Sequence, residues 1–546
     1  MKIFLKRYYP LGVFLLVAMV IMGPLYGRGY VFLIDMVWGP GANLTEMLRD
    51  GIGPMFPLNA MLLFLSFLFS WEILQKIVLT FILFLPGLAM FQLASKYMRR
   101  SLAIASGLLF MLNPYVCERL FVGHWVVLLG YGFFPIMVWL LIGFFEKQTW
   151  RSFFLLALGF AVYPLLSLHW AYIATGFLLV YGGVVVFQKK AWAKLFSLWA
   201  LKKILLLAAT FCLVNGFWLL GFFDRTKTFS NIGLSDFRAF STLPDPHFGV
   251  FFNVLSLYGI WSNSFLLPKD YLSWWWAITI VVLFFAIIGA WSQIRKRNLL
   301  AWAIVISFGP ALLLSVGYGS AFTQAITDFL FATLPFFRGL RDTEKISGVL
   351  AFGYAFLVPL GISAASLFFE KSSHLGKIAK QWFSLEALAF VVPLLWAGTL
   401  LWGGYGQFTP HSYPQGWQEA QVALQKEGDV RNVLFLPWHM YIKLNFADNV
   451  MAASPAGVFF PEKMLVGKDT DNRFLLASEK SPLDAHVSLL EKETILDDRE
   501  FWQSEQVSHI VIAKTDDWEK FANLDTSAFF EKIVDNDSMV VFRIKY

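Results

Sequence analysis

Long apolar segments constrain the fold of this chain more than any other feature of its sequence. A helix needs about 20 mostly apolar residues to cross a bilayer, with about 17–25 as the usual range. Hydrophobic residues make up 58% of the 546 residues and charged residues only 15%, whereas soluble proteins carry about 25% charged residues. We therefore predict a polytopic α-helical membrane protein with about eleven transmembrane helices. The predicted spans are Leu11–Leu25, Ile77–Leu93, Leu102–Asn113, Val126–Phe145, Phe153–Leu168, Trp170–Phe187, Ile204–Phe222, Trp274–Trp291, Leu299–Val316, Gly348–Phe369 and Leu385–Trp402.

One further apolar segment, Pro57–Ser70, holds only 14 residues, and charge decides how it is interpreted. If it does not span, five basic turns fall on the side of the amino terminus. Those turns hold 16 Lys and Arg and two acids, whereas the opposite loops hold 11 basic and 12 acidic residues. Lys and Arg are enriched in cytoplasmic loops. The pattern therefore favours an interfacial helix at Pro57–Ser70 and a cytoplasmic amino terminus.

The same orientation places the carboxy-terminal tail outside the cell. Residues 403–546 hold 14 Lys and Arg against 22 Asp and Glu, whereas the rest of the chain holds 30 against 15. The basic excess belongs to the membrane part, where it reports orientation, so we predict no nucleic-acid partner. Strand-like "VRNVLFLPW", "SHIVIAK" and "MVVFRIKY" alternate with polar stretches in the tail, which indicates a small α/β domain. We divide the chain into a transmembrane domain, 1–402, with outward loops 25–76, 114–125, 223–273 and 317–347, and an extracytoplasmic domain, 403–546.

Asp35 lies in the apolar stretch "VFLIDMVWGPG", just after the first span. A carboxylate in such surroundings costs free energy unless it is paired or used. In an outward loop beside the membrane it suits a general base that activates a hydroxyl. The alternative is a structural role, as a helix cap or as a partner of Arg28 or Arg49.

Three further groups of outward residues are candidates. In "NPYVCERLFVGHW", an Asn-Pro break precedes Glu118, Arg119 and His124. Neighbours on a helix point apart, so Glu118 and Arg119 are not one neutralised pair, although both could instead snorkel toward water. His169, between two spans in "LLSLHWAY", is more often structural at such a place.

The third group is "PFFRGLRDTEK", which opens the tenth span. Arg338 and Arg341 are three residues apart and would share a helix face that could clamp a phosphate. A helix beginning here would add the attraction of its N-terminal dipole. The remaining charges are Asp342, Glu344 and Lys345, and the alternative is a set of snorkelling interface charges.

Motifs for soluble cofactors are missing from the sequence. It has no nucleotide-binding Gly-Lys loop, no HExxH and no GxSxG, and its two cysteines, Cys117 and Cys212, are too few for a zinc site. The cytoplasmic loops are too short for a nucleotide-binding domain. We therefore predict no cofactor and a donor that comes from the membrane or the exterior. A divalent metal remains possible, without a ligand cluster to support it.

The layout as a whole resembles the GT-C glycosyltransferase superfamily. It combines an amino-terminal span, an acidic first outward loop, an interfacial helix, a many-span bundle and an outer carboxy-terminal domain. More closely, "NPYVCERLFVGHW", "FFRGLRDTEK" and "VLFLPWHMY" resemble the YfhO-like and 6-pyruvoyl-tetrahydropterin-synthase-related membrane proteins of bacteria and archaea. The likeness covers most of the chain with loose motifs.

The resemblance implies a sugar transfer from a polyprenyl-phosphate donor to a glycan, lipid or protein acceptor outside the plasma membrane of a bacterium or archaeon. Asp35 matches the base of these enzymes, and Arg338, Arg341 or Lys345 would hold the donor phosphate during an inverting displacement. "WWW" at 274–276 lacks the Asp that oligosaccharyltransferases carry after Trp-Trp, which disfavours asparagine-linked transfer. The alternatives are a flippase of lipid-linked glycan and a non-catalytic scaffold of envelope assembly.

Overall fold

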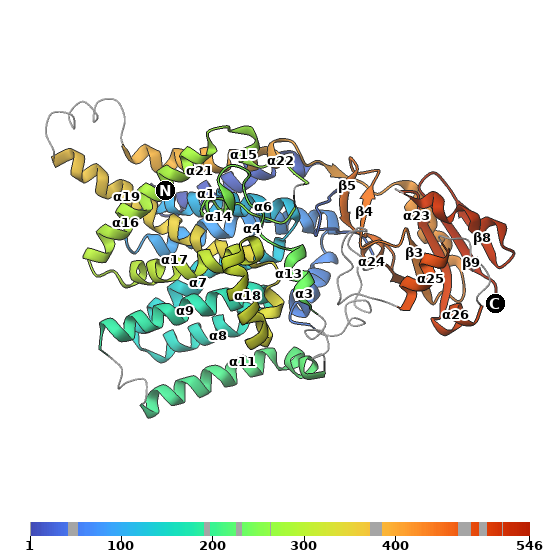
Figure 1. The fold of residues 1–546 in the computed structure, drawn as a ribbon, viewed down its shortest axis with the longest axis horizontal. Helices are drawn as coiled ribbons and strands as arrows, with labels where there is room; N and C mark the ends of the chain where they lie inside the picture. The colour runs from blue at the N-terminus through green and yellow to red at the C-terminus, as the bar shows by residue number, and fades with distance from the viewer. Residues whose placement is uncertain are drawn as a thin grey trace.

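The protein consists of a helical bundle that carries a small sheet domain at one end (Figure 1). The computed structural model describes residues 2–41, 53–190, 197–224, 232–262, 264–371, 385–467, 482–490, 499–515 and 517–546. Within them, ten helices are long and apolar enough to cross a membrane. The helices of the bundle are α1 (Lys2–Met22), α4 (Trp71–Ala94), α5 (Arg100–Met111), α6 (Pro114–Val122), α7 (Trp125–Lys147), α8 (Trp150–Leu166), α9 (Leu168–Gln188), α11 (Leu198–Asp224), α16 (Trp275–Arg295), α17 (Leu299–Val316), α19 (Gly348–Lys371), α21 (Leu388–Ala397) and α22 (Leu401–Tyr405).

The predicted span that is not among these ten is Phe153–Leu168, which corresponds to α8, a helix of 17 residues and about 26 Å. It packs against α7, α9 and α11. The predicted fold class, a polytopic bundle with a small C-terminal sheet domain, is therefore confirmed. Shorter helices connect the spans: α3 (Phe56–Ser66), α13 (Leu234–Ala239), α14 (Gly249–Leu255), α15 (Pro268–Tyr271), α18 (Ala321–Thr333), and the 3-10 turns η1 (Gly23–Tyr26), η2 (Gly317–Gly319), η5 (Leu385–Ala387) and η6 (Gly398–Leu400).

The segment Pro57–Ser70 forms α3, whose 11 residues extend only about 17 Å. A helix of this length is too short to cross about 30 Å of hydrocarbon. Figure 1 places α3 at the end of the bundle next to the C-terminal domain. An interfacial position for α3 stays a prediction, because the structure contains no membrane.

Basic turns meet at the other end of the bundle. Lys96 pairs with Glu146, and Arg99 pairs with Glu386. Arg100 lies 4.7 Å above the ring of Tyr9 near the start of α1. The turn after α4, the end of α7 and η5 therefore lie together beside α1. This is the end of the bundle that holds the amino terminus, as the charge pattern predicts.

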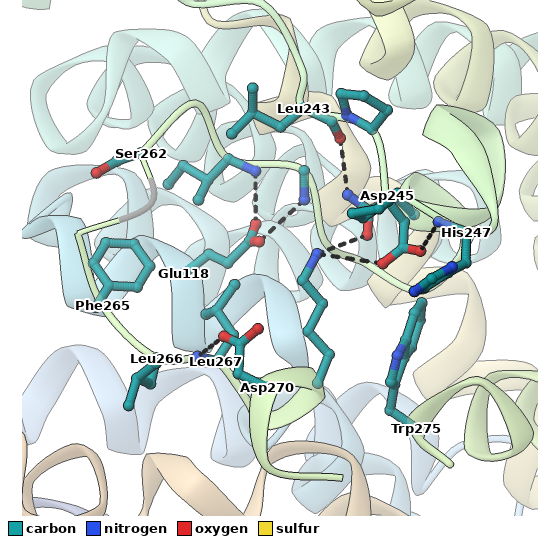
Figure 2. A pocket seen from close by; sticks show the side chains of 16 residues that line it. Glu118, Leu243, Asp245, His247, Ser262, Phe265, Leu266, Leu267, Asp270 and Trp275 are labelled. Atoms are coloured by element: carbon teal, nitrogen blue, oxygen red, sulfur yellow. Dashed lines mark hydrogen bonds and ion pairs between the residues drawn. The ribbon is translucent and has the colours of Figure 1, made fainter. Parts of the chain in front are cut away.

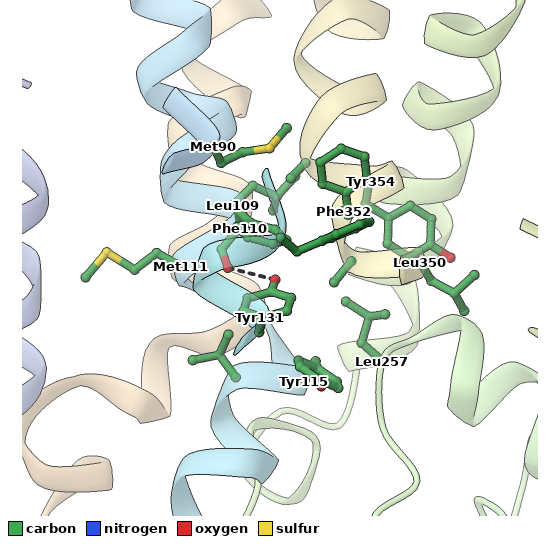
Figure 3. Close-up of a cluster of buried hydrophobic side chains, with 14 of the residues drawn as sticks. Met90, Leu109, Phe110, Met111, Tyr115, Tyr131, Leu257, Leu350, Phe352 and Tyr354 are labelled. Carbon is green, nitrogen blue, oxygen red and sulfur yellow. Dashed lines mark hydrogen bonds between the residues drawn. The ribbon is translucent and has the colours of Figure 1, made fainter. Parts of the chain in front are cut away.

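The short span Leu102–Asn113 continues as α6 after a break at Asn113 and Pro114. The side-chain oxygen Oδ1 of Asn113 caps α6 by accepting from Val116 N at 3.1 Å, and its Nδ2 donates to Leu109 O, Phe110 O and the Tyr131 hydroxyl. Tyr131 stacks on Phe110 with ring centroids 4.0 Å apart and donates to Phe110 O (Figure 3). The polar groups freed by the break are thus satisfied inside the apolar core.

Two glycines allow α16 and α19 to touch through their backbones. A Cβ on Gly361 would lie 1.8 Å from Phe285 O, and one on Gly289 would lie 2.1 Å from Leu357 O. Close contact of this kind is typical of small residues at helix interfaces in membranes. It fixes α19 against the bundle, and with it the charged segment that precedes α19.

The charged segment before α19, residues 335–347, does not form an α-helix. Residues 335–347 form two 3-10 turns, η3 (Pro335–Leu340) and η4 (Thr343–Ser347), and the α-helix begins only at Gly348. The helix therefore begins where the predicted span Gly348–Phe369 begins, and the condition under which Arg338 and Arg341 would share a face of that helix is not met. Glu344 and Lys345 are buried against the bundle at this point, and side chain pairing, rather than a helix dipole, governs the segment.

The C-terminal domain is a mixed five-stranded sheet in the order β6–β3–β7–β9–β8. The three strand-like segments of the tail are β3, β7 and β9, as predicted. Trp417, Ala420 and Leu424 of α23 pack on one face of the sheet, and Leu483, Val487 and Trp502 of two later helices pack on the other. The elements are β2 (Pro410–His411), α23 (Gln415–Lys426), β3 (Asn432–Leu436), β4 (Tyr441–Leu444), β5 (Val450–Ala453), α24 (Ala456–Phe459), β6 (Lys463–Leu465), α25 (Pro482–Leu490), α26 (Arg499–Ser504), β7 (Val507–Ala513), η7 (Trp518–Thr526), β8 (Phe530–Asp535) and β9 (Met539–Ile544).

Candidate functional site

The loop after α1 connects the bundle to the C-terminal domain. Its strand β1 (Tyr30–Val31) pairs antiparallel with β2, and the side chain of Gln75 on α4 bonds both the N–H and the carbonyl of Val31 at 2.8 Å. A bridge between Leu33 and Met36 then closes a tight turn. Asp35 occupies this turn, and its backbone N–H donates to Val122 O at 2.7 Å. The turn is thereby attached directly to the end of α6.

Both carboxylate oxygens of Asp35 are hydrogen-bonded. Oδ2 lies 2.8 Å from His124 Nε2, and Oδ1 accepts from the hydroxyl of Tyr441 at 2.6 Å. The sequence left open that Asp35 pairs with Arg28. In the structure Arg28 lies near Glu72 instead. Arg49 lies outside the described residues. The Asp35 side chain remains 27% exposed, so a further group can reach it.

The partners of His124 determine its tautomer. Arg119 Nη1 lies 2.9 Å from His124 Nδ1. A guanidinium can only donate, so Nδ1 carries the lone pair and Nε2 carries the proton. His124 is therefore neutral and donates its Nε2–H to Asp35. Burial lowers the pKa of His124, and the Arg119 cation lowers it further, against the raising effect of Asp35.

Asp35 is ionised at neutral pH. Burial by itself raises the pKa of this carboxyl, but the hydrogen bonds from His124 and Tyr441 and the nearby Lys345 cation outweigh it, and the pKa lies below its ordinary value. An ionised carboxylate beside a neutral histidine can accept a proton from a hydroxyl.

Arg119 is the centre of a buried ion cluster. It is fully buried, its two Nη groups contact Asp342 at 2.5 and 3.3 Å, and Nη2 also pairs with Glu344. Lys345 Nζ lies 3.4 Å from Asp342 Oδ2. Arg119 thus joins η4 to α6 and to His124, and Glu118 does not share its contacts, as its position on the helix predicts.

The arginines proposed for phosphate binding lie on separate aromatic rings. Arg338 lies 4.7 Å above the ring of Phe331, and Arg341 lies 4.6 Å above the ring of Phe240. Among the described residues neither makes an ion pair. Arg341 is close enough to act on Lys345, and Lys345 is in turn the charge that acts most strongly on His169. Of these groups, Lys345 also acts on Asp35, so Lys345 is the cation of this segment that lies nearest the Asp35 turn.

Glu118 faces a different space, a cavity of about 480 Å³ under the loop before α16 (Figure 2). Its carboxylate accepts from the backbone N–H groups of Gly259 at 3.0 Å and Ile260 at 3.2 Å. Asp245 and Asp270 also line the cavity, together with Lys269, whose Nζ lies 3.2 Å from Asn253 Oδ1. Carboxyl groups therefore outnumber the one ammonium in the lining of this cavity.

Sequence reasoning missed two of these features. Tyr441 ends the motif "VLFLPWHMY", but nothing in that pattern predicts a contact 406 residues from Asp35. Lys269 and Asp270 lie on the short helix α15 and Asp245 lies in the connection before α14, and no motif marks either place. Within the described part of the chain, no group of three or more His, Cys, Asp or Glu side chains is arranged to hold a metal.

Comparison with known proteins bears on the fold. No known family profile and no curated protein matches the sequence. The structure of the arabinofuranosyltransferase AftD from Mycobacteria has a TM-score of 0.62 at 12% identity, over 100% of this chain and 40% of AftD. A mutant of AftD gives 0.62 at 13% identity, over 98% of this chain and 41% of its own length. ArnT from Cupriavidus metallidurans, in the apo state, matches over 99% of this chain and 98% of its own length at 11% identity, with a lower TM-score of 0.48.

These likenesses concern architecture. The chain spans about two fifths of the length of AftD. At 12% identity the match shows a shared fold and leaves residue roles open. The YfhO-like resemblance stays a prediction. The chain shares the fold of AftD, and membership of the GT-C superfamily stays a prediction.

Proposed function

We propose that this protein is a membrane glycosyltransferase that moves a sugar from a polyprenyl-phosphate donor to an acceptor outside the membrane. The observation that carries this proposal is the ionised Asp35, oriented by a neutral His124 and close enough to the Lys345 cation for that charge to act on it. AftD, which shares the fold, is by its name an arabinofuranosyltransferase, and this supports the reaction class.

The proposed reaction is an inverting displacement. Asp35 takes the proton of an acceptor hydroxyl while the hydroxyl oxygen bonds to the anomeric carbon of the donor. The bond between that carbon and the phosphate oxygen breaks, and the lipid phosphate leaves with the electron pair. Arg341 and Lys345, with Arg338 further along the loop, stabilise the charge on the phosphate. The phosphate is already ionised, so the step needs no strong general acid.

The two charged regions of the site suit different parts of the substrates. A phosphate is favoured beside Arg341 and Lys345 and disfavoured in the cavity lined by Glu118, Asp245 and Asp270. A neutral or cationic sugar fits the cavity, whose carboxylates, amide and Trp275 are the groups that recognise hydroxyls and sugar faces. We therefore place the sugar of the acceptor there.

The proposed topology follows the charges. The basic turns beside the amino terminus are placed in the cytoplasm, and the C-terminal domain and Asp35 are placed outside the plasma membrane of a bacterium or archaeon. The polyprenyl donor reaches the site from the bilayer. No cofactor is required.

The test compares Asp35→Asn with the wild type in purified membranes. The assay measures transfer of labelled sugar from polyprenyl-phosphate donors to envelope glycans, at equal amounts of folded protein. Loss of a general base is expected to reduce transfer about 10²–10⁴-fold. Asp429→Asn, on the exposed surface of the C-terminal domain, is the matched control and is expected to transfer normally.

Two results would contradict the proposal. Full transfer by Asp35→Asn would remove Asp35 from the reaction. No transfer by the wild type from any such donor would favour the alternatives, a flippase of lipid-linked glycan or a non-catalytic scaffold.

A further inference from the structure

We propose that Tyr441 of the C-terminal domain is a positioning residue for Asp35, so that the catalytic site is complete only when this domain is docked on the bundle. The inference rests on the proposed function, in which Asp35 is the base. Its starting point is the bond from the Tyr441 hydroxyl to Asp35 Oδ1 at 2.6 Å. The two residues are 406 positions apart and belong to different domains.

A second donor is needed because one hydrogen bond does not orient a carboxylate. The terminal torsion of an aspartate is broad and soft, and His124 holds only Oδ2. Tyr441 holds the other oxygen from the opposite domain. Together the two donors fix the plane of the carboxylate, and with it the direction of the lone pairs that accept the proton.

Tyr441 is itself fixed relative to the Asp35 turn. It begins β4, where it lies opposite Ala453 of β5. The N–H of Ala453 donates to Ile34 O at 2.8 Å, one residue before Asp35. The Tyr441 ring packs against the apolar cluster of Ile34, Val122 and Ile260. The phenol therefore approaches Asp35 from a direction set by a β-ladder and not by a flexible loop.

The contact leaves Asp35 able to react. Each carboxylate oxygen has two lone pairs, and Tyr441 uses one of those on Oδ1. The side chain of Asp35 is still 27% exposed. An acceptor hydroxyl can therefore bond to the same carboxylate while Tyr441 stays in place.

The experiment compares Tyr441→Phe with Tyr413→Phe in the full chain. The Tyr413 hydroxyl donates to Trp38 O at 2.9 Å, so it also joins the C-terminal domain to this loop but does not contact Asp35. For Tyr441→Phe we expect a kcat about tenfold lower, an unchanged KM for the polyprenyl-phosphate donor, and an acid limb of the pH–rate profile displaced to higher pH. The displacement follows because loss of a donor to the ionised form raises the pKa of Asp35. Tyr413→Phe is expected to keep the acid limb of the wild type.

Two outcomes would overturn the inference. One is a Tyr441→Phe variant with the rate and acid limb of the wild type. The other is an equal loss in both variants with unmoved acid limbs, which would show that the hydroxyls serve docking alone.

A substrate-free measurement separates failure of this inference from failure of the proposed function. A carboxyl whose pKa is depressed in the folded state stabilises the protein above its unfolded pKa, and this stabilisation is lost as the pH falls through the folded pKa. The thermal-unfolding difference between wild type and Tyr441→Phe should therefore hold near neutral pH and shrink as the pH falls below about 4, through the folded pKa of Asp35. If the wild type transfers no sugar but this difference is present, the contact stands and the proposed function fails. A difference that does not change with pH overturns the inference.

Discussion

Replacement of Arg119 by Met gives the sharpest test of the buried ion cluster. Arg119 is fully buried. It donates to Asp342, Glu344 and His124. A methionine of similar length keeps the packing on Tyr115, whose ring lies 5.6 Å from the guanidinium. The charge and its donors are lost, and two carboxylates remain buried.

Breaking a buried ion pair by removing one partner costs about 3–5 kcal/mol. Lys345 Nζ, 3.4 Å from Asp342 Oδ2, compensates one carboxylate in part, whereas Glu344 keeps, among the described residues, the hydroxyl of Ser347 at 2.5 Å. We therefore expect Arg119→Met to lower the free energy of unfolding by about 3–4 kcal/mol, toward the lower end of that range.

The assay follows unfolding of the purified protein in detergent with denaturant, at neutral pH. The variant that combines Arg119→Met and Lys345→Met with Asp342→Asn and Glu344→Gln is the control, because replacing all charges of a buried cluster is often nearly neutral. It should regain most of the stability. An Arg119→Met protein within about 1 kcal/mol of the wild type would refute the cluster as described.

Two further predictions concern the cations and the turn. Arg341→Ala is expected to raise the KM for the polyprenyl-phosphate donor about 5–10-fold, because a charge-assisted contact to the phosphate is lost. The control is Arg295→Ala, since the Arg295 guanidinium also lies on an aromatic ring, 4.5 Å above Trp291. Equal donor KM values in the two variants would contradict the assignment of Arg341 to the phosphate. Gly123→Ala is expected to cost about 1–3 kcal/mol in thermal or denaturant unfolding, because Gly123 has φ +91° and an added Cβ would lie 2.7 Å from Met36 N; unchanged stability would show that the turn of Asp35 adapts freely.

Local chemistry accounts for what could be predicted from the sequence. Spans are recognisable because a bilayer requires long apolar helices, whatever their neighbours are. The break at Asn113 and Pro114 was predictable because proline lacks an N–H and asparagine caps the next turn. The strands of the tail were visible for the same reason, since short apolar runs between polar stretches are typical of a buried sheet.

Asp35 was recognisable as a candidate because a carboxylate among apolar residues is costly, and the sequence alone shows that cost. Its partners were not predictable, since His124 comes from the end of α6 and Tyr441 from the C-terminal domain. The 3-10 turns that hold Arg338 and precede the helix at Gly348 were not predictable either, because Arg119 pairs with Asp342 and Glu344 of this segment from across the bundle.

The sequence by itself determined that the chain crosses the membrane many times, where its spans lie and that a small sheet domain follows them. The tertiary structure decided which charges pair, which tautomer His124 adopts and which domain completes the environment of Asp35. The physical reason is range. Burial and backbone preferences act on neighbouring residues and leave a periodic record, whereas a hydrogen bond forms over about 3 Å between residues that only the fold brings together.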